Sequence, residues 1–532
     1  MAEPIEAHDD AEGGTFKFLY NEKDSLMSID NDDYIEFSLS QKDTLIHQRV
    51  AEIPRPAMPL VPETPKKKLL ERLPLSKTTS AMMRVIRGVH LETETSKQRM
   101  FSQWTFKNVY KHIMTDPLYK NSIFNMASTF ILGGLGFVFW IIIARLYKTE
   151  YVGIAATLIS IMSLLSSFTI MGLGSSLTRY LPKSVNKNEL INSSFVIVAI
   201  FALLASVIFL LGLQVFSPQL LFLRSNFFYI FSFTIFIILC SWNNLVESIF
   251  MAFRAAGNIL IKNIIISILK LVLPFALIAF GTYGIFASSA SALALGVLAG
   301  LIILFIKFKI KFSISVNFSL IKEYSVYSIS NYMVSFMLTM PSLVLSVVIL
   351  NVLSAKYAAY YYVASTIQSV LLVIPMVAEQ ALLTEGSHNE TELKKHVKKA
   401  IAMILVILIP ATAIIVLFGN ILLQFFGKSY AIEAFQFLQL YSVSTIFTAL
   451  LLIANAIMNV KHKIKTLVIS NIIAAVLTLG LSYAFISGKL VGIGWGWTLG
   501  QAIAGLVSIY FIIRYSDTPS ILSISKQDLG GT

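Results

Sequence analysis

Twelve apolar runs, each about twenty residues long, follow one another along this chain from Asn121 to Arg514. A helix of about 20 predominantly apolar residues crosses the roughly 30 Å hydrocarbon core of a bilayer. The runs therefore predict an all-α, polytopic membrane protein with about twelve transmembrane helices. The predicted spans are 121–144, 152–174, 191–214, 227–249, 259–281, 283–306, 325–350, 357–382, 399–419, 432–458, 466–486 and 490–513.

The composition agrees with a lipid environment. Hydrophobic residues make up 56% of the chain and charged residues 13%, whereas a soluble domain has about a quarter charged residues. The net charge of +13 could suggest nucleic acid. The basic residues of the apolar part lie in short loops between the runs, however, so membrane topology explains them and we expect no nucleic-acid partner.

The segment before the first run differs in composition. Of the 29 acidic residues, 18 precede Asn121, and five prolines lie between Pro54 and Pro65. We predict that residues 1–115 form a largely disordered cytoplasmic extension, acidic and then basic. Its basic and aromatic part either lies on an anionic leaflet or belongs to an unstructured extension whose charges help to set orientation. The first fifty residues contain no continuous apolar core, so we expect no cleavable signal peptide.

Loop charges predict the orientation. One set of alternate loops holds sixteen Lys and Arg residues, among them Arg254 and Lys262, which we assign to the loop between the fourth and fifth spans; the other set holds six. Lys and Arg are retained on the cytoplasmic side. We therefore predict a multi-pass protein of the cell (plasma or inner) membrane with both termini cytoplasmic, residues 515–532 being the C-terminal tail.

The two halves of the chain resemble each other. The sequence NSIFNMASTF at residues 121–130 shares Ser, Ile, Asn and Phe with YSISNYMVSF at 327–336. Six helices per unit give both units the same orientation, related by an axis along the membrane normal. We predict two six-helix lobes, residues 116–316 and 317–514, around a central cleft.

Motifs of enzyme chemistry are absent from the sequence. The chain has no G-x-x-x-x-G-K-[ST] loop, its seven histidines have no metal-site spacing, and its one cysteine, Cys240, lies in an apolar run. We expect no enzyme activity, metal or bound cofactor, although a proton or sodium gradient could drive the protein.

The first hairpin resembles a known family. FWIIIARLY at residues 139–147, followed by EYVG at 150–153, is similar to the signature of polysaccharide transporters. With twelve spans and a repeat, residues 121–514 resemble the Wzx-type flippases of the multidrug, oligosaccharidyl-lipid and polysaccharide exporter superfamily. Tyr147 and Lys148 depart from the usual Leu-Gly, and residues 1–120 are longer than the family's usual N-terminus.

This resemblance implies a function. A Wzx-type flippase moves a polyprenyl-(di)phosphate-linked oligosaccharide from the cytoplasmic to the exterior leaflet by alternating access, and works in a pathway with glycosyltransferases and a polymerase. Two alternatives stay open: an ion-coupled drug or metabolite antiporter of the same superfamily, and a membrane scaffold that recruits partners through residues 1–115.

Four residues are candidates for substrate binding. Lys270 lies halfway along the fifth span, where a charge costs at least about 2.5 to 3.5 kcal/mol; it either binds the substrate phosphate or sugar, or snorkels to an interface. Arg145 belongs to the family signature and either attracts the headgroup or anchors the helix end. Asn125 and Asn331 are equivalent in the repeat and either face the substrate or join helices by hydrogen bonds.

Four further residues are candidates for coupling or gating. Glu247 and Glu379 lie inside spans, where they either carry the coupling ion or are solvated at the interface. Arg179 and Glu385 are repeat-equivalent and opposite in charge. They either close a cytoplasmic gate or are ordinary juxtamembrane charges.

Overall fold

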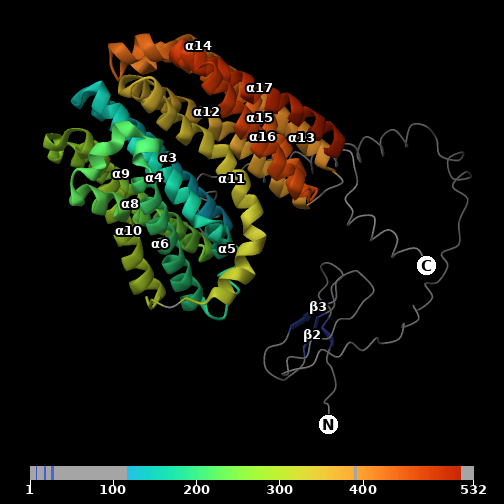
Figure 1. Ribbon diagram of the computed structural model, residues 1–532. Helices are drawn as coiled ribbons and strands as arrows, with labels where there is room; N and C mark the ends of the chain where they lie inside the picture. Colours follow the sequence, from blue (N-terminus) through green and yellow to red (C-terminus); the bar gives the residue numbers. More distant parts are fainter. Residues whose placement is uncertain are drawn as a thin grey trace, which may run out of the picture. The chain divides into compact units, whose positions relative to one another are not determined.

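The computed structural model describes residues 7–8, 17–19, 26–28, 117–314, 316–388 and 392–516 (Figure 1), with only the backbone of 117–119, 318–328, 330–331, 388 and 516. Two compact units, residues 1–97 and 98–532, are described separately. The first contains an antiparallel sheet of three short strands, β1 (Ala7–His8), β2 (Lys17–Leu19) and β3 (Leu26–Ser28), in the order β1-β2-β3. The predictions for the rest of 1–115 and for the tail after residue 516 lie outside the described residues.

The second unit confirms the predicted twelve helices, each long and apolar enough to cross a membrane. The first six are α3 (Pro117–Leu146), α4 (Thr149–Ile170), α6 (Lys187–Leu211), α8 (Phe227–Ala252), α9 (Ala256–Ala276) and α10 (Gly281–Phe308). The second six are α11 (Phe318–Val352), α12 (Ala355–His388), α13 with α14 (Leu393–Met403 and Ile409–Gln424), α15 (Lys428–Val460), α16 (Ile464–Ala484) and α17 (Lys489–Ser516). Short helical segments between them are α5 (Leu173–Tyr180), α7 (Leu213–Phe216), η1 (Pro218–Arg224), η2 (Ile278–Phe280) and η5 (Ile486–Gly488).

The ninth span is interrupted where proline requires it. Between α13 and α14 lies one π-helical turn, η4 (Ile404–Leu408), and Pro410 follows in the first turn of α14. Proline has no N–H to donate, and its ring clashes with the carbonyl four residues earlier. One wider turn relieves that clash while the helix continues.

The helices form two groups, as the repeat predicts (Figure 1). In the N-lobe, α9 packs on α3 and α10, and α8 packs on α6 and α4; in the C-lobe, α15 packs on α12, α14 and α17, and α16 packs on α17 and α11. The lobes meet mainly where α4 contacts α11 and α12. The lobe boundaries and the central cleft stay predictions.

A close approach of the two lobes depends on Gly153, which belongs to the family-like signature. A Cβ atom at Gly153 of α4 would lie only 1.7 Å from the backbone oxygen of Ala355, at the start of α12. No larger residue fits there without moving a backbone. Small residues allow this kind of close helix packing in membranes.

Loops alternate between the two ends of the bundle. We call the end with the loops after the odd-numbered spans the odd-loop end, and the opposite end the even-loop end. The sequence predicts that the odd-loop end is exterior and the even-loop end cytoplasmic.

Candidate functional site

Polar side chains line one face of α8 inside the N-lobe. Cys240, Asn243, Asn244 and Glu247 are spaced at i, i+3, i+4 and i+7, which places them on the same side of the helix. Asn244 donates a hydrogen bond of 3.4 Å to Ser166 on α4. The helix therefore brings two amides and a carboxylate to one face inside the N-lobe.

A buried ion pair joins α8 to α9. The Nζ of Lys262 lies 2.7 Å from Oε1 of Glu247 and also donates to Oδ1 of Asn243. The Lys262 side chain is completely buried, whereas that of Glu247 is 33% exposed. The assignment of Lys262 to a loop was wrong: it lies in α9, where Glu247 compensates its charge. A charge inside a membrane protein is tolerated when such a partner is present.

Lys270 lies two turns further along α9 and has a different environment. Its Nζ lies 6.0 Å from the centre of the Phe139 ring of α3, in a cation–π contact. Within the described part of the chain, no carboxylate forms an ion pair with Lys270. The two lysines of α9 therefore differ, since a carboxylate compensates Lys262 and an aromatic ring lies beside Lys270.

Arg145 connects the two lobes at the odd-loop end. Its Nε donates a hydrogen bond of 2.9 Å to the carbonyl of Phe425, and its Nη2 donates one of 2.6 Å to the carbonyl of Gln424. These carbonyls lie at the C-terminus of α14, which has no N–H partners of its own for them and attracts positive charge. In this conformation Arg145 therefore caps a helix of the other lobe.

Further polar contacts join the lobes at the same end. Lys356 forms an ion pair of 3.3 Å with Glu150. Ser217 donates to Oδ1 of Asn351 at 2.8 Å, and Asn351 in turn donates to the carbonyl of Phe216 at 2.7 Å. All these contacts lie between residues far apart in the sequence. Polar contacts thus join the lobes at the odd-loop end; those of Arg145 and Lys356 are exposed, and that of Ser217 is part-buried.

The predicted gate residues, Arg179 and Glu385, are not paired with each other in this conformation. Arg179 ends α5, is exposed and lies over the ring of Tyr180 at 5.6 Å. Glu385 is exposed near the end of α12, and among the described side chains no ion pair joins it to Arg179. Their gating role stays a prediction.

The remaining candidates are dispersed. Glu379 is half-buried on α12, where no described side chain forms an ion pair with it. Asn125 is half-buried on α3, and its backbone carbonyl accepts a hydrogen bond from Thr129. The side chain of Asn331 lies outside the described residues. The structure does not bring these three together, and their roles stay predictions.

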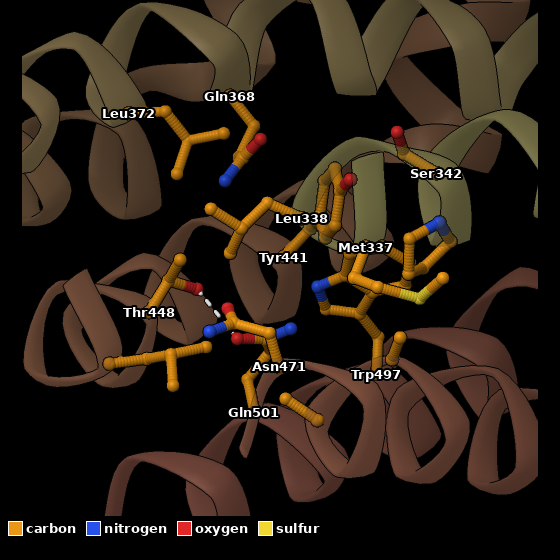
Figure 2. A pocket seen from close by; sticks show the side chains of 14 residues that line it. Met337, Leu338, Ser342, Gln368, Leu372, Tyr441, Thr448, Asn471, Trp497 and Gln501 are labelled. Atoms are coloured by element: carbon orange, nitrogen blue, oxygen red, sulfur yellow. Dashed lines mark hydrogen bonds between the residues drawn. The ribbon is translucent and has the colours of Figure 1, made fainter. Parts of the chain in front are cut away.

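A neutral polar cavity of about 70 Å³ lies inside the C-lobe (Figure 2). Its amides bind one another or nearby hydroxyls: Thr448 donates to Gln501 at 2.9 Å, and Gln501 donates to Thr478 at 3.1 Å. Asn471 exchanges hydrogen bonds with Asn455 at 2.9 and 3.2 Å. The volume holds about two water molecules. Our predictions from the sequence concentrated on charged residues and did not include this cluster. The amide side chains within the apolar spans were the signal in the sequence that could have revealed it.

Among the described residues, no group of three or more His, Cys, Asp and Glu side chains could hold a metal ion.

Comparison with solved structures shows the fold. An inward-facing conformation of a multidrug resistance MATE family transporter of the MOP superfamily has a TM-score of 0.58 and 16% identity, covering 72% of this chain and 94% of that one. A MATE protein in complex with MaD5 has a TM-score of 0.52 and 16% identity, and a MATE protein in the bent conformation has 0.51 and 14%; each match covers 75% of this chain and 96% of the other.

Comparison with sequences shows a likeness to one family. None of the curated proteins matches this chain. The sequence profile of the family described as "Polysaccharide biosynthesis protein" matches residues 118–380, which run from the start of α3 to the second half of α12. Residues 118–380 are thus similar to that family, and the chain has the fold of the MATE transporters of the MOP superfamily.

Proposed function

We propose that this protein flips a polyprenyl-(di)phosphate-linked oligosaccharide from the cytoplasmic to the exterior leaflet, by alternating access between its lobes, for surface polysaccharide or glycan assembly. The family match supports the glycan, and the transporter fold supports the movement. Lys270 is the structural observation that carries the proposal.

The charges of the N-lobe suit an anionic headgroup. Glu247 already compensates Lys262, whereas Lys270 has no carboxylate partner among the described residues. An unpaired charge at mid-membrane depth is costly and is usually retained for a ligand or ion. A phosphate or diphosphate is a ligand that such a cation binds well. Lys270 would then meet the phosphate when the cleft opens.

Alternating access requires the lobe contacts at the odd-loop end to break. Those contacts are Arg145 with the end of α14, Lys356 with Glu150, and Ser217 with Asn351. The contacts of Arg145 and Lys356 are exposed, so water replaces their lost partners at low cost. The conformation that these contacts hold would be the one closed to the exterior.

A proton or sodium ion is the proposed driving ion. Glu379 is the better candidate for the coupling site, because Glu247 is engaged with Lys262. We expect Glu379→Gln to flip substrate at a rate independent of an imposed pH or sodium gradient. Unchanged gradient dependence in that variant would exclude Glu379.

The proposed location is the cell membrane with both termini cytoplasmic, where glycosyltransferases and a polymerase of the same pathway would act on the same glycan. Export of a drug or metabolite is the second candidate, because multidrug transporters share the fold. At 16% identity, that likeness does not extend to the substrate.

The test is flipping in proteoliposomes with a fluorescent polyprenyl-diphosphate oligosaccharide. Lys270→Met should slow flipping roughly tenfold to a hundredfold, the loss expected for a hydrogen bond to a charged group. Its thermal stability should be unchanged or higher, because a buried charge is removed. Lys270→Arg should retain part of the rate, and Lys428→Met, at an exposed lysine of the odd-loop end, should retain all of it.

Two outcomes would count against the proposal. Flipping that is unchanged in Lys270→Met would remove Lys270 from the site. No flipping of any lipid-linked glycan, together with gradient-driven export of a cationic dye, would replace the flippase with the antiporter.

A further inference from the structure

A large apolar groove lies on the N-lobe between α6, α8 and α10. It encloses about 790 Å³, within the range of about 300 to 1,000 Å³ of ligand sites. Ala199 and Leu203 line it on α6, Trp242 lines it on α8, and Ile302 and Phe305 line it on α10. The exposed fractions of Ile302 and Phe305 are 56% and 60%. The groove is therefore open at the side of the lobe.

Polar groups close the groove only at the even-loop end. The Nδ2 of Asn192 donates to the carbonyl of Lys311 at 2.8 Å and to the hydroxyl of Ser313 at 3.3 Å. These bonds hold the segment after α10 across the end of the groove, where Phe312 joins the lining. Trp242 directs its Nε1 to the carbonyl of Phe195 at 3.1 Å. The indole N–H of Trp242 therefore has its hydrogen-bond partner outside the groove.

The segment across this end is positively charged. No Asp or Glu occurs anywhere from residue 248 to residue 322. Lys309 and Lys311 are exposed, and neither forms an ion pair within the described residues. Lys307, by contrast, donates to Asn258 at 3.3 Å. Two exposed ammonium groups therefore lie beside an apolar groove at the end of the spans, at the depth of lipid headgroups.

We propose that this groove is a binding site for an anionic phospholipid of the bilayer. One acyl chain lies in the groove against Trp242, Ile302 and Phe305, and the phosphate lies between Lys309 and Lys311. Apolar lining continuous with a cationic rim is the complement of such a lipid. A zwitterionic phospholipid fills the groove equally well but offers the two lysines no net negative charge.

The position of the groove favours a bilayer lipid over the transported lipid. The contacts between the lobes are made mainly by α3, α4, α5 and η1 with α11, α12 and α14, and α6 makes only a smaller contact with α11. The groove lies instead on α6, α8 and α10, and its lining contains no charged side chain. Its rim belongs to the segment that leads to α11, so a bound lipid would hold the connection between the lobes.

The experiment uses the tryptophan in the groove. The purified full chain is placed in zwitterionic nanodiscs containing a small fraction of brominated phosphatidylglycerol or, in parallel, brominated phosphatidylcholine. Quenching by bromine in the acyl chain is measured in wild type and in Trp242→Phe, and the difference isolates Trp242. We expect quenching of Trp242 to saturate at a lower fraction of phosphatidylglycerol than of phosphatidylcholine.

Two variants separate the rim from the groove. Lys309→Ala/Lys311→Ala should weaken phosphatidylglycerol binding on the order of 30-fold, from the loss of two cations near the surface. Lys398→Ala/Lys399→Ala, which removes two exposed lysines of α13 at the same end, should change nothing. Ala199→Phe should block the groove and abolish the quenching of Trp242 while size-exclusion and thermal unfolding stay as in wild type.

Three results would overturn the proposal. Equal quenching by the two brominated lipids would leave only ordinary bilayer contact. Unchanged binding in Lys309→Ala/Lys311→Ala would remove the headgroup site. Displacement of brominated phosphatidylglycerol by a stoichiometric amount of polyprenyl phosphate would assign the groove to the transported lipid.

Discussion

Two lysines of the same helix, α9, differ in what they contact. Lys262 is buried against Glu247 and Asn243, and Lys270 lies over Phe139 without a carboxylate partner among the described residues. Lys262 and Glu247 form a structural ion pair, because removing either partner would leave the charge of the other uncompensated. The environment of Lys270 is the observation on which we base the proposal that it binds the substrate phosphate.

The ion pair leads to a prediction about stability. Glu247→Leu leaves the buried Lys262 uncompensated and should lower the thermal unfolding temperature in detergent. The loss for a fully buried pair is about 3 to 5 kcal/mol, and partial exposure of Glu247 makes it smaller in this protein. Glu247→Leu/Lys262→Met should recover most of the lost stability, because apolar residues of similar volume replace the pair. If Glu247→Leu alone were as stable as wild type, the ion pair would not be structural.

At the scale of single residues, the sequence indicated which side chains are unusual for their position but not which residues they contact. Lys270 was identified because one charge in an apolar run is visible without a structure. The pairing of Lys262 with Glu247 was missed. The two residues are 15 positions apart on different helices, and we had assigned Lys262 to the loop between the fourth and fifth spans. Arg145 was expected at a helix end, but its partners, Gln424 and Phe425, lie 279 and 280 residues away. No local pattern could reveal them.

The helices themselves followed from hydropathy, because lipid requires every span to be a long apolar helix. All twelve predicted spans are present, and their ends differ by several residues. The eighth span, predicted at 357–382, extends over Ala355–His388. A helix continues past the apolar core wherever its backbone can remain hydrogen-bonded, and hydropathy alone does not report that extension.

Between elements, the bond of Arg145 to α14 predicts control over lobe opening. In a Cys240→Ala background, a reporter Ala359→Cys is introduced at a fully buried position of α12 beside Gly153. Arg145→Gln should raise the rate of thiol labelling at this reporter roughly tenfold, because hydrogen bonds from a charged group no longer hold the lobes together.

Arg224 provides the control for that experiment. Its guanidinium also donates to helix-end carbonyls at the odd-loop end, those of Leu210 and Leu211, but both lie in its own lobe. Arg224→Gln should therefore leave the labelling rate unchanged. Equal effects of the two substitutions would show that Arg145 stabilises its surroundings without holding the lobes together.

For the whole molecule, we expect transport to need the twelve helices and not the N-terminal segment. The matched family region begins at residue 118. Deletion of residues 1–115 should therefore retain most of the flipping activity in proteoliposomes. Complete loss of flipping by a correctly folded deletion variant would support recruitment or regulation through that segment.

Alternating access means that substrate crosses as the two lobes open at opposite ends in turn, and the contact of Ser217 with Asn351 allows a direct test. In a Cys240→Ala background, Ser217→Cys/Asn351→Cys is crosslinked with a short bis-methanethiosulfonate reagent, and flipping of the lipid-linked oligosaccharide is measured before crosslinking, after it, and after reduction. Each single-cysteine variant, treated with the same reagent, is the control. We predict that crosslinking stops flipping and that reduction restores it, whereas undiminished flipping by fully crosslinked protein would contradict alternating access between these lobes.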